Sequence, residues 1–437
     1  MSPSPPDRPR LRPVEVFPFE ENGKRTFLLQ DPGGYLEAPL QLSGAALLLV
    51  GLCDGSRTLD AVRAEFEERS GHALSSEDLS GFLAAMDQAH LLDSPAFAAH
   101  RDALEREFAA REWRAASHAG SAYEGEPRPL AAALDRWLAA GVAGGRAEGR
   151  LLALIAPHID FHRGGAGYGR SYAALLGREP PEVVVVLGTG HAAEAGRFIL
   201  CDKGFETARG DLPLDRDFLG RLEARLPRSY RRGVLAHRRE HSIEFQAVWL
   251  AHLFPHDARP AIVPILCTSF DDLMDGAGGP ARCPEAADFL GGLRETWLEE
   301  RRRVLVVAGA DLSHVGPRFG DEQRATPGFL EQIEARDRAA LDGAKTGSAD
   351  RFFAAVAAHR NSHRICSVAG IFAALATVRA RSGDLLVYEQ AVDPRGELAV
   401  TFAGLALYGD ADGHGLARTS RPQRRSRNAG SGRGPPR

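Results

Sequence analysis

The chain has 437 residues, of which 44% are hydrophobic and 26% are charged, and its formal net charge at pH 7 is -4. This is the composition of an ordinary globular protein with ample core, and domains of roughly 100 to 200 residues predict two or three of them here. The slightly negative charge argues against a dedicated nucleic-acid-binding protein.

The N-terminal stretch MSPSPPDRPR is rich in proline and lacks the apolar segment of a secretory signal. The most apolar run, AALLLVGLC, is far shorter than the ~20 residues that span a bilayer. The five cysteines lack the paired spacing of a zinc finger and are typical of free thiols in a reducing compartment. We therefore expect a cytoplasmic protein that binds neither membranes nor nucleic acids.

Residues 14–93 predict a small domain of their own. RTFLLQ, the turn DPGG and YLEAPL predict a β-hairpin, and three short helical patterns follow it. A hairpin packed on three helices is the winged-helix plan. Its candidate recognition helix, Glu77–Ala89, is acidic and would repel phosphate groups, so DNA binding is not expected.

The segment LSGAALLLVGLCDGSRTLDAVRAEF resembles the PqqD-like domains. These are small peptide-recognition modules that are often fused to modification enzymes. The resemblance implies a PqqD-like winged-helix domain over residues 14–93, and the alternative is a generic helical cap on the rest of the chain.

A charged helical linker is expected over residues 94–112, followed by a large α/β domain over residues 113–409. Near-continuous apolar runs alternate there with helical stretches, which predicts a sheet covered by helices on both faces. The strand candidates are Leu151–Ile155, Val183–Leu187, Ala261–Leu266, Val304–Ala308, Leu385–Gln390 and Leu398–Leu407. Residues 410–437 are basic and rich in Gly, Pro and Ser, which predicts a disordered tail.

Polar clusters follow three of these strand candidates: APHIDFH, LGTGH and AGADLSH. Ligands of open α/β sheets bind at the carboxyl ends of strands, so side chains from distant segments meet there. In the first cluster His158, Asp160 and His162 alternate with apolar residues and would share a face of an extended chain. This stretch is either a metal or proton-transfer site or a polar strand end.

Two further features belong to the other clusters. The glycines of LGTGH allow a sharp turn that exposes His191. In AGADLSH, Asp311 and His314 are spaced for general acid–base chemistry, and the alternative is a helix start capped by Asp311.

Glu240 and His241 open the predicted helix of EHSIEFQAVWLAHLF, either as an ordinary cap or as part of a pocket.

From REWRAASHAGSAY to FAGLALYG the chain resembles the Memo family, also called AmmeMemoRadiSam system protein B. The matching pieces occur in the family's order: SHAGSAY, APHIDF, LGTGH, EHSIEFQ, VPIL, ADLSHVG and ICSVAGI. The resemblance implies a fold similar to the LigB-like extradiol dioxygenases, which hold non-haem iron.

The same resemblance implies a metal site at His158, His191 and Cys366, with Asp311 and His314 beside it as acid–base groups. Two imidazoles and a thiolate favour Fe(II), Cu(I) or Zn(II) over Mg(II), with iron or copper preferred and zinc as the alternative.

The sequence departs from the family pattern at Asp160 and His162. We expect these two residues, together with Glu240 and His241, to orient the ligands or to lie at the rim of the cleft.

The leading hypothesis is a metal-binding protein with redox or oxygenase-like chemistry that acts with radical-SAM and AMMECR1-like partners, as the resemblance implies. The alternative is a non-catalytic module that binds a peptide or protein through the cleft and the PqqD-like domain. A third hypothesis is hydrolysis by Cys366 and His314.

Overall fold

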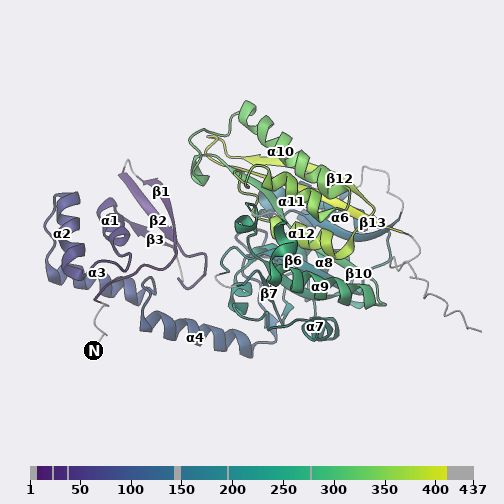
Figure 1. Ribbon diagram of the computed structural model, residues 1–437, viewed down its shortest axis with the longest axis horizontal. Coiled ribbons are helices and arrows are strands. Elements are labelled where there is room, and N and C mark those ends of the chain that lie inside the picture. Colours follow the sequence, from purple (N-terminus) through teal and green to yellow (C-terminus); the bar gives the residue numbers. More distant parts are fainter. Residues whose placement is uncertain are drawn as a thin grey trace, which may run out of the picture.

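The computed structural model describes residues 7–21, 24–36, 39–141, 149–193, 196–275 and 278–410, so the tail expected over residues 410–437 lies outside the described residues except for Asp410. A small N-terminal domain and a large α/β domain are joined by the long helix α4 (Pro95–Ala110), which runs between them in Figure 1. No helix among the described residues is long and apolar enough to cross a membrane.

The N-terminal domain is an antiparallel three-stranded sheet packed on three helices. The strands lie in the order β1 (Glu15–Glu21), β2 (Lys24–Gln30) and β3 (Leu40–Leu42), and the helices are α1 (Gly44–Leu52), α2 (Leu59–Ser70) and α3 (Ser76–Gln88). The hydroxyl of a Ser or Thr caps each helix by accepting a backbone N–H. The domain has its own apolar core, separate from those of the large domain.

The hairpin expected across DPGG is wrong in its bounds. β2 does pair with β3, but β3 begins only at Leu40. The chain between them leaves the ladder because the carboxylate of Asp31 accepts the backbone N–H groups of Gly33, Tyr35 and Leu36 at 3.0, 3.0 and 3.1 Å. The long hairpin of this domain is instead formed by β1 and β2, and β1 was not anticipated.

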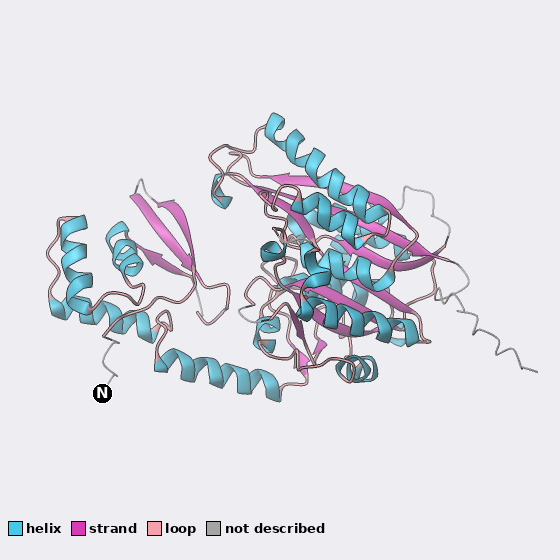
Figure 2. Ribbon diagram, viewed as in Figure 1, coloured by secondary structure: helices cyan, strands magenta, loops and turns pink. Residues whose placement is uncertain are grey.

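The large domain is built on an eight-stranded mixed sheet (Figure 2). At its centre, β5 (Arg150–Ala156), β10 (Val304–Gly309), β6 (Val183–Thr189) and β9 (Ala261–Cys267) are parallel neighbours in that order. Antiparallel strands complete it: β13 (Ala399–Gly409), β11 (Asp311–Val315), β12 (Ser382–Val392) and β7 (Phe198–Leu200). All six strand candidates of the large domain are therefore confirmed as members of one sheet.

Helices cover both faces, as the apolar runs predicted. One face carries α5 (Pro127–Gly141), α6 (Phe161–Tyr172) and α8 (His241–Leu253). The other carries α7 (Arg216–Glu223), α9 (Pro284–Glu299), α10 (Pro327–Lys345), α11 (Ala349–Ala357) and α12 (Val368–Val378). The side chains of β6 alternate between these faces. Those of Val184 and Val186 pack on the face covered by α5, α6 and α8, and those of Val183, Val185 and Leu187 pack on the opposite face.

Shorter elements complete the domain. β4 (Trp113–Arg114) and β8 (Gly204–Phe205) form a separate parallel pair. The 3-10 helices are η1 (Ala173–Leu175), η2 (Val234–Arg238), η3 (His256–Ala258), η4 (Asp271–Leu273), η5 (Gly279–Arg282) and η6 (Pro317–Phe319).

Two glycines let α8 begin directly against the ends of the central strands. A Cβ on Gly188 of β6 would lie 2.5 Å from Cγ1 of Ile243, and one on Gly309 of β10 would collide with the backbone oxygen of Ser242. In addition, the hydroxyl of Ser242 accepts the backbone N–H of Thr189 at 2.9 Å. The first turn of α8 is therefore held at the carboxyl edge of the parallel strands.

Candidate metal centre

Three histidines from distant parts of the chain meet at this edge of the sheet. His158 follows β5, His191 follows β6 and His241 is the first residue of α8. One potential ligand atom from each lies within 4.8 Å of the other two. His158 is buried, whereas the side chains of His191 and His241 are 34% and 31% exposed. The cluster could bind a metal ion, and it is open on one side.

Each of these imidazoles has its Nδ1 next to a fixed acceptor. Nδ1 of His158 lies 2.9 Å from the backbone oxygen of Gly309. Nδ1 of His191 and Nδ1 of His241 lie 3.1 and 3.3 Å from the carboxylate of Glu240. Because a carbonyl and a carboxylate only accept hydrogen bonds, Nδ1 of each ring carries a proton, and Nε2 is the nitrogen that can take either a second proton or a metal ion. This is the arrangement that metal-binding histidines adopt.

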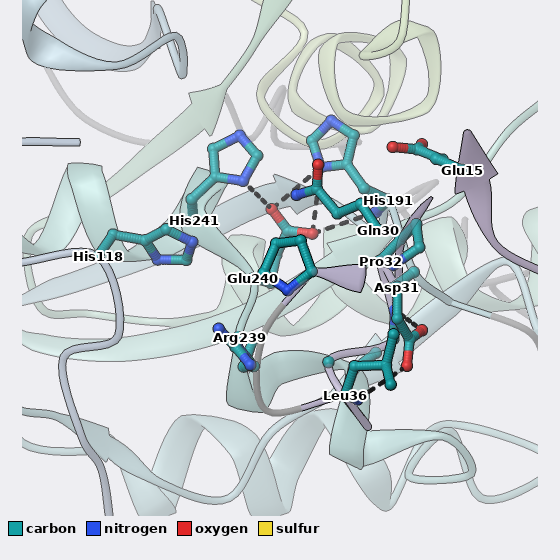
Figure 3. Close-up of a pocket in the computed structure, with 15 residues that line it drawn as sticks. Glu15, Gln30, Asp31, Pro32, Leu36, His118, His191, Arg239, Glu240 and His241 are labelled. Atoms are coloured by element: carbon teal, nitrogen blue, oxygen red, sulfur yellow. Dashed lines mark hydrogen bonds and ion pairs between the residues drawn. The ribbon is translucent and has the colours of Figure 1, made fainter. Parts of the chain in front are cut away.

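Glu240 is the N-cap of α8, and its carboxylate contacts the rings of both His191 and His241 (Figure 3). It also accepts the backbone N–H of His191 at 3.1 Å and that of Ser242 at 2.9 Å. Burial alone would raise the pKa of Glu240, but His191 and His241 lower it well below its ordinary value. Burial would lower the pKa of His191, yet Glu240 raises it well above its ordinary value, whereas burial dominates at His241 and lowers its pKa.

Cys366 joins the cluster from the segment just before α12. Its Sγ lies 3.4 Å from Nε2 of His158 and 3.3 Å from the hydroxyl of Ser367. Burial would raise the pKa of Cys366, but His158 and His314 lower it well below its ordinary value. Burial would likewise lower the pKa of His158, while Asp311 and Cys366 raise it to about 9. The sulfur and the imidazole therefore favour a thiolate–imidazolium pair.

Asp311 and His314 lie on strand β11, not at the start of a helix. One carboxylate oxygen of Asp311 accepts the backbone N–H of His158 at 2.8 Å, and the other lies 3.7 Å from its Nε2. His314 is placed further out: its Nδ1 lies 3.0 Å from the backbone oxygen of Leu312, and its ring meets the edge of Phe319. Asp311 thus contacts the cluster directly, whereas His314 affects it by lowering the pKa of Cys366.

The shared face expected for His158, Asp160 and His162 is wrong. β5 ends at Ala156 and α6 begins at Phe161, so the alternation of an extended chain does not reach these residues. Asp160 is the N-cap of α6 and accepts the backbone N–H of Arg163 at 3.1 Å. His162 is exposed on the first turn of that helix.

Beneath the cluster, the buried carboxylate of Glu244 fixes the segment SHAGSAY against α8. It pairs with the buried guanidinium of Arg114 and accepts the hydroxyl of Tyr123 at 2.6 Å. It also accepts the backbone N–H of His118 at 3.0 Å, which places that ring 5.6 Å from the ring of His241. Burial would raise the pKa of Glu244, but His118 and Arg114 hold it below its ordinary value.

A cavity of about 340 Å³ opens beside the histidines, and both domains line it. The large domain contributes His118, His191, Arg239 and His241. The N-terminal domain contributes residues of the segment 30–36 and, from β1, Glu15 (Figure 3).

His241 was expected to orient a ligand or to lie at the rim, but its ring lies within the cluster. The adjacent pair of Glu240 and His241 in EHSIE was the available signal, since a carboxylate beside an imidazole often fixes its tautomer. Arg114 and His118 were not identified as partners of the site.

Comparison with known proteins finds one family model and several relatives that resemble this chain. A family model described as "Memo-like protein" matches residues 114–406. A MEMO1 family protein of Aquifex aeolicus is 26% identical over 405 residues, which are 92% of this chain and 100% of that protein. A MEMO1 family protein of Thermus thermophilus is 31% identical over 332 residues, 76% of this chain and 93% of that protein. The Aquifex match covers so much of the chain that it extends into the N-terminal domain.

Proposed function

The chain belongs to the Memo-like family, and on that premise we propose that it is a metal-binding protein whose ion is held by His158, His191 and Cys366. The observation that carries the proposal is the orientation of the imidazoles, whose Nδ1 atoms face fixed acceptors, so that Nε2 is the nitrogen that could bind an ion. Donors bonded to one tetrahedral ion at about 2.0 to 2.3 Å are roughly 3.5 Å apart. The 3.4 Å between Sγ of Cys366 and Nε2 of His158 fits that spacing.

The donor set also supports a class of metal. Imidazole nitrogen and thiolate sulfur favour Fe(II), Cu(I) or Zn(II) over the hard ions Mg(II) and Ca(II). Iron or copper would supply redox or oxygenase-like chemistry, and zinc would supply a Lewis acid. We propose a redox metal, iron or copper, with zinc as the alternative.

The surrounding residues then have separate tasks. The carboxylate of Asp311 orients His158 by accepting the backbone N–H of that histidine. The carboxylate of Glu240 does the same for His191. His241 lines the cavity and its Nδ1 is held by Glu240, so its Nε2 is the ring nitrogen that can accept a hydrogen bond from a bound molecule. Asp311 and His314 are our further candidates for acid–base work at the edge of the site.

Elemental analysis of anaerobically purified protein tests the proposal. We expect about one equivalent of metal per chain in the wild type and strong loss in the His158→Ala and Cys366→Ser variants. Metal-free protein that cannot be loaded with iron, copper or zinc would contradict it. Oxygen consumption by the loaded protein that depends on an added substrate would establish turnover.

A second candidate function is binding without turnover, and the position of the N-terminal domain beside the cavity favours it. In that case metal-free protein would bind a peptide or other ligand as tightly as loaded protein. Radical-SAM and AMMECR1-like partners are part of the proposal only through the family resemblance, and co-purification from cells would test them.

A further inference from the structure

The N-terminal domain contacts the chain immediately before the histidine cluster. The guanidinium of Arg238 donates a hydrogen bond to the backbone oxygen of Gly34 at 2.5 Å. The stem of Arg239 packs so closely on Gly34 that a Cβ there would collide with it, and Gly34 has a φ of +67°. Only glycine adopts that conformation readily, and only glycine leaves room for the arginine.

The contact at Gly34 lies next to the metal site in the sequence as well as in space. Arg239 directly precedes Glu240, which contacts two of the imidazoles, and His241, which belongs to the cluster. The turn around Gly34 therefore packs against Arg238 and Arg239, the two residues just before Glu240 in the chain. It is held rigid by Asp31, whose carboxylate accepts backbone N–H groups of the turn and also pairs with Arg12 at 2.9 Å.

The charged side chains that line the cavity differ in whether they have an ion-pair partner. Asp31 is paired with Arg12, and Glu240 is occupied by His191 and His241. Arg239, in contrast, is exposed and has no ion-pair partner among the described residues, although it lines the same cavity as the histidines. An unpaired guanidinium offers a planar fork of donors that matches a carboxylate.

The opposite wall carries the other sign of charge. Glu15 and Gln30 of the N-terminal sheet line the cavity, and Glu15 is exposed. A carboxylate-bearing molecule would be drawn toward Arg239 and repelled from Glu15, which sets its orientation. The volume of about 340 Å³ lies at the lower end of the range of roughly 300 to 1,000 Å³ that small-molecule pockets occupy.

We propose that this cavity binds a small molecule with a single carboxylate, which pairs with Arg239 while the other end of the molecule faces the histidine cluster. The turn at residues 31–36 forms one wall, so the N-terminal domain is part of the binding site. This inference rests on the proposed metal site, and it adds the chemical class of the ligand and the residue that recognises it.

Two probes that share a metal-binding head and differ in charge test the inference. Imidazole-4-acetate carries a carboxylate, and 4-methylimidazole does not. Isothermal titration of zinc-loaded full-length protein is expected to give about fivefold tighter binding of the acetate, since an exposed ion pair contributes up to about 1 kcal/mol.

The variant Arg239→Gln should lose this preference while keeping its zinc content. Arg232→Gln, at an exposed arginine of the same segment that does not line the cavity, is the matched control and should keep the preference. Gly34→Val should weaken the binding of imidazole-4-acetate at unchanged zinc content, because the side chain would push the wall away from Arg239.

Equal affinity of the wild type for the two probes, or an undiminished preference in Arg239→Gln, would overturn the inference. A protein that takes up no zinc would contradict the proposed function alone. In that case the same comparison is made with metal-free protein, where Arg239 should still favour the acetate over the neutral probe.

Discussion

Glu240 accepts hydrogen bonds from both the backbone N–H and Nδ1 of His191, each at 3.1 Å. The same carboxylate lies 3.3 Å from Nδ1 of His241. Because Glu240 is also the cap of α8, the position of the helix and the orientation of two imidazoles depend on one side chain. Substitutions at this residue should therefore affect both the metal site and the start of α8.

Glu240→Gln should weaken metal binding by about 10- to 100-fold, the usual effect of removing a group that orients a ligand. The amide keeps the size of the side chain but presents an NH₂ group to one of the two rings. Competition with a chromophoric chelator measures the affinity. An unchanged affinity would show that His191 needs no partner at Nδ1.

Cys366→Ser should reduce metal content strongly and leave the fold intact, because a hydroxyl is nearly isosteric but a poorer ligand. Cys283→Ser is the control, since that cysteine is partly exposed and outside the cluster. Elemental analysis and circular dichroism measure the two properties. If His241→Ala loses metal and Cys366→Ser does not, the three histidines form the site without the thiolate.

Gly188→Ala should displace the first turn of α8, since its Cβ would lie 2.5 Å from Ile243. We expect weaker metal binding and a lower melting temperature. Gly220→Ala in α7 is the control, because its Cβ meets nothing within 4 Å. That change should stabilise the protein by about 0.5 to 1 kcal/mol, the helix preference of alanine over glycine.

Glu244→Leu should destabilise the protein by about 3 to 5 kcal/mol, because it leaves the guanidinium of Arg114 buried without its partner. The double variant with Arg114→Leu should lose less stability than the sum of the two single variants. Thermal unfolding of all four proteins gives this cycle. Additive losses would mean that the pair does not interact energetically.

His237 predicts an acid-sensitive contribution to stability. It is fully buried, its Nε2 lies 3.0 Å from the backbone oxygen of Ile199, and burial lowers its pKa from 6.5 to about 4. The unfolded chain takes up the proton first, so this stability is complete above pH 6.5 and is lost as the pH falls toward 4.

Unfolding at pH 5 should therefore take up about one proton fewer in His237→Gln than in the wild type. The amide can still donate to Ile199 but does not titrate. Calorimetry in buffers of different ionisation enthalpy counts the protons. Equal uptake by the two proteins would show that His237 is already protonated in the fold.

The sheet of the large domain could be predicted because its central strands are buried on both faces and appear as continuous apolar runs. β1 escaped prediction, since EVFPFEE mixes charges and a proline into the strand. Such residues are tolerated there because β1 lies at an edge of its sheet.

The candidate site was predicted only where it lies next to a strand in the sequence. His158 and His191 follow β5 and β6 directly, so strand-end reasoning finds them. Cys366 precedes a helix and needed the family resemblance. The position of His241 depends on how closely α8 packs against Gly188 and Gly309. The local sequence around His241 does not predict this packing.

His158 and Cys366 are separated by 208 residues, yet they are in contact. During synthesis of the chain, the first imidazole leaves the ribosome long before the sulfur that lies against it. No early segment can therefore assemble the complete set of donors. A nascent or truncated chain should hold metal weakly, and full loading should follow folding of the large domain.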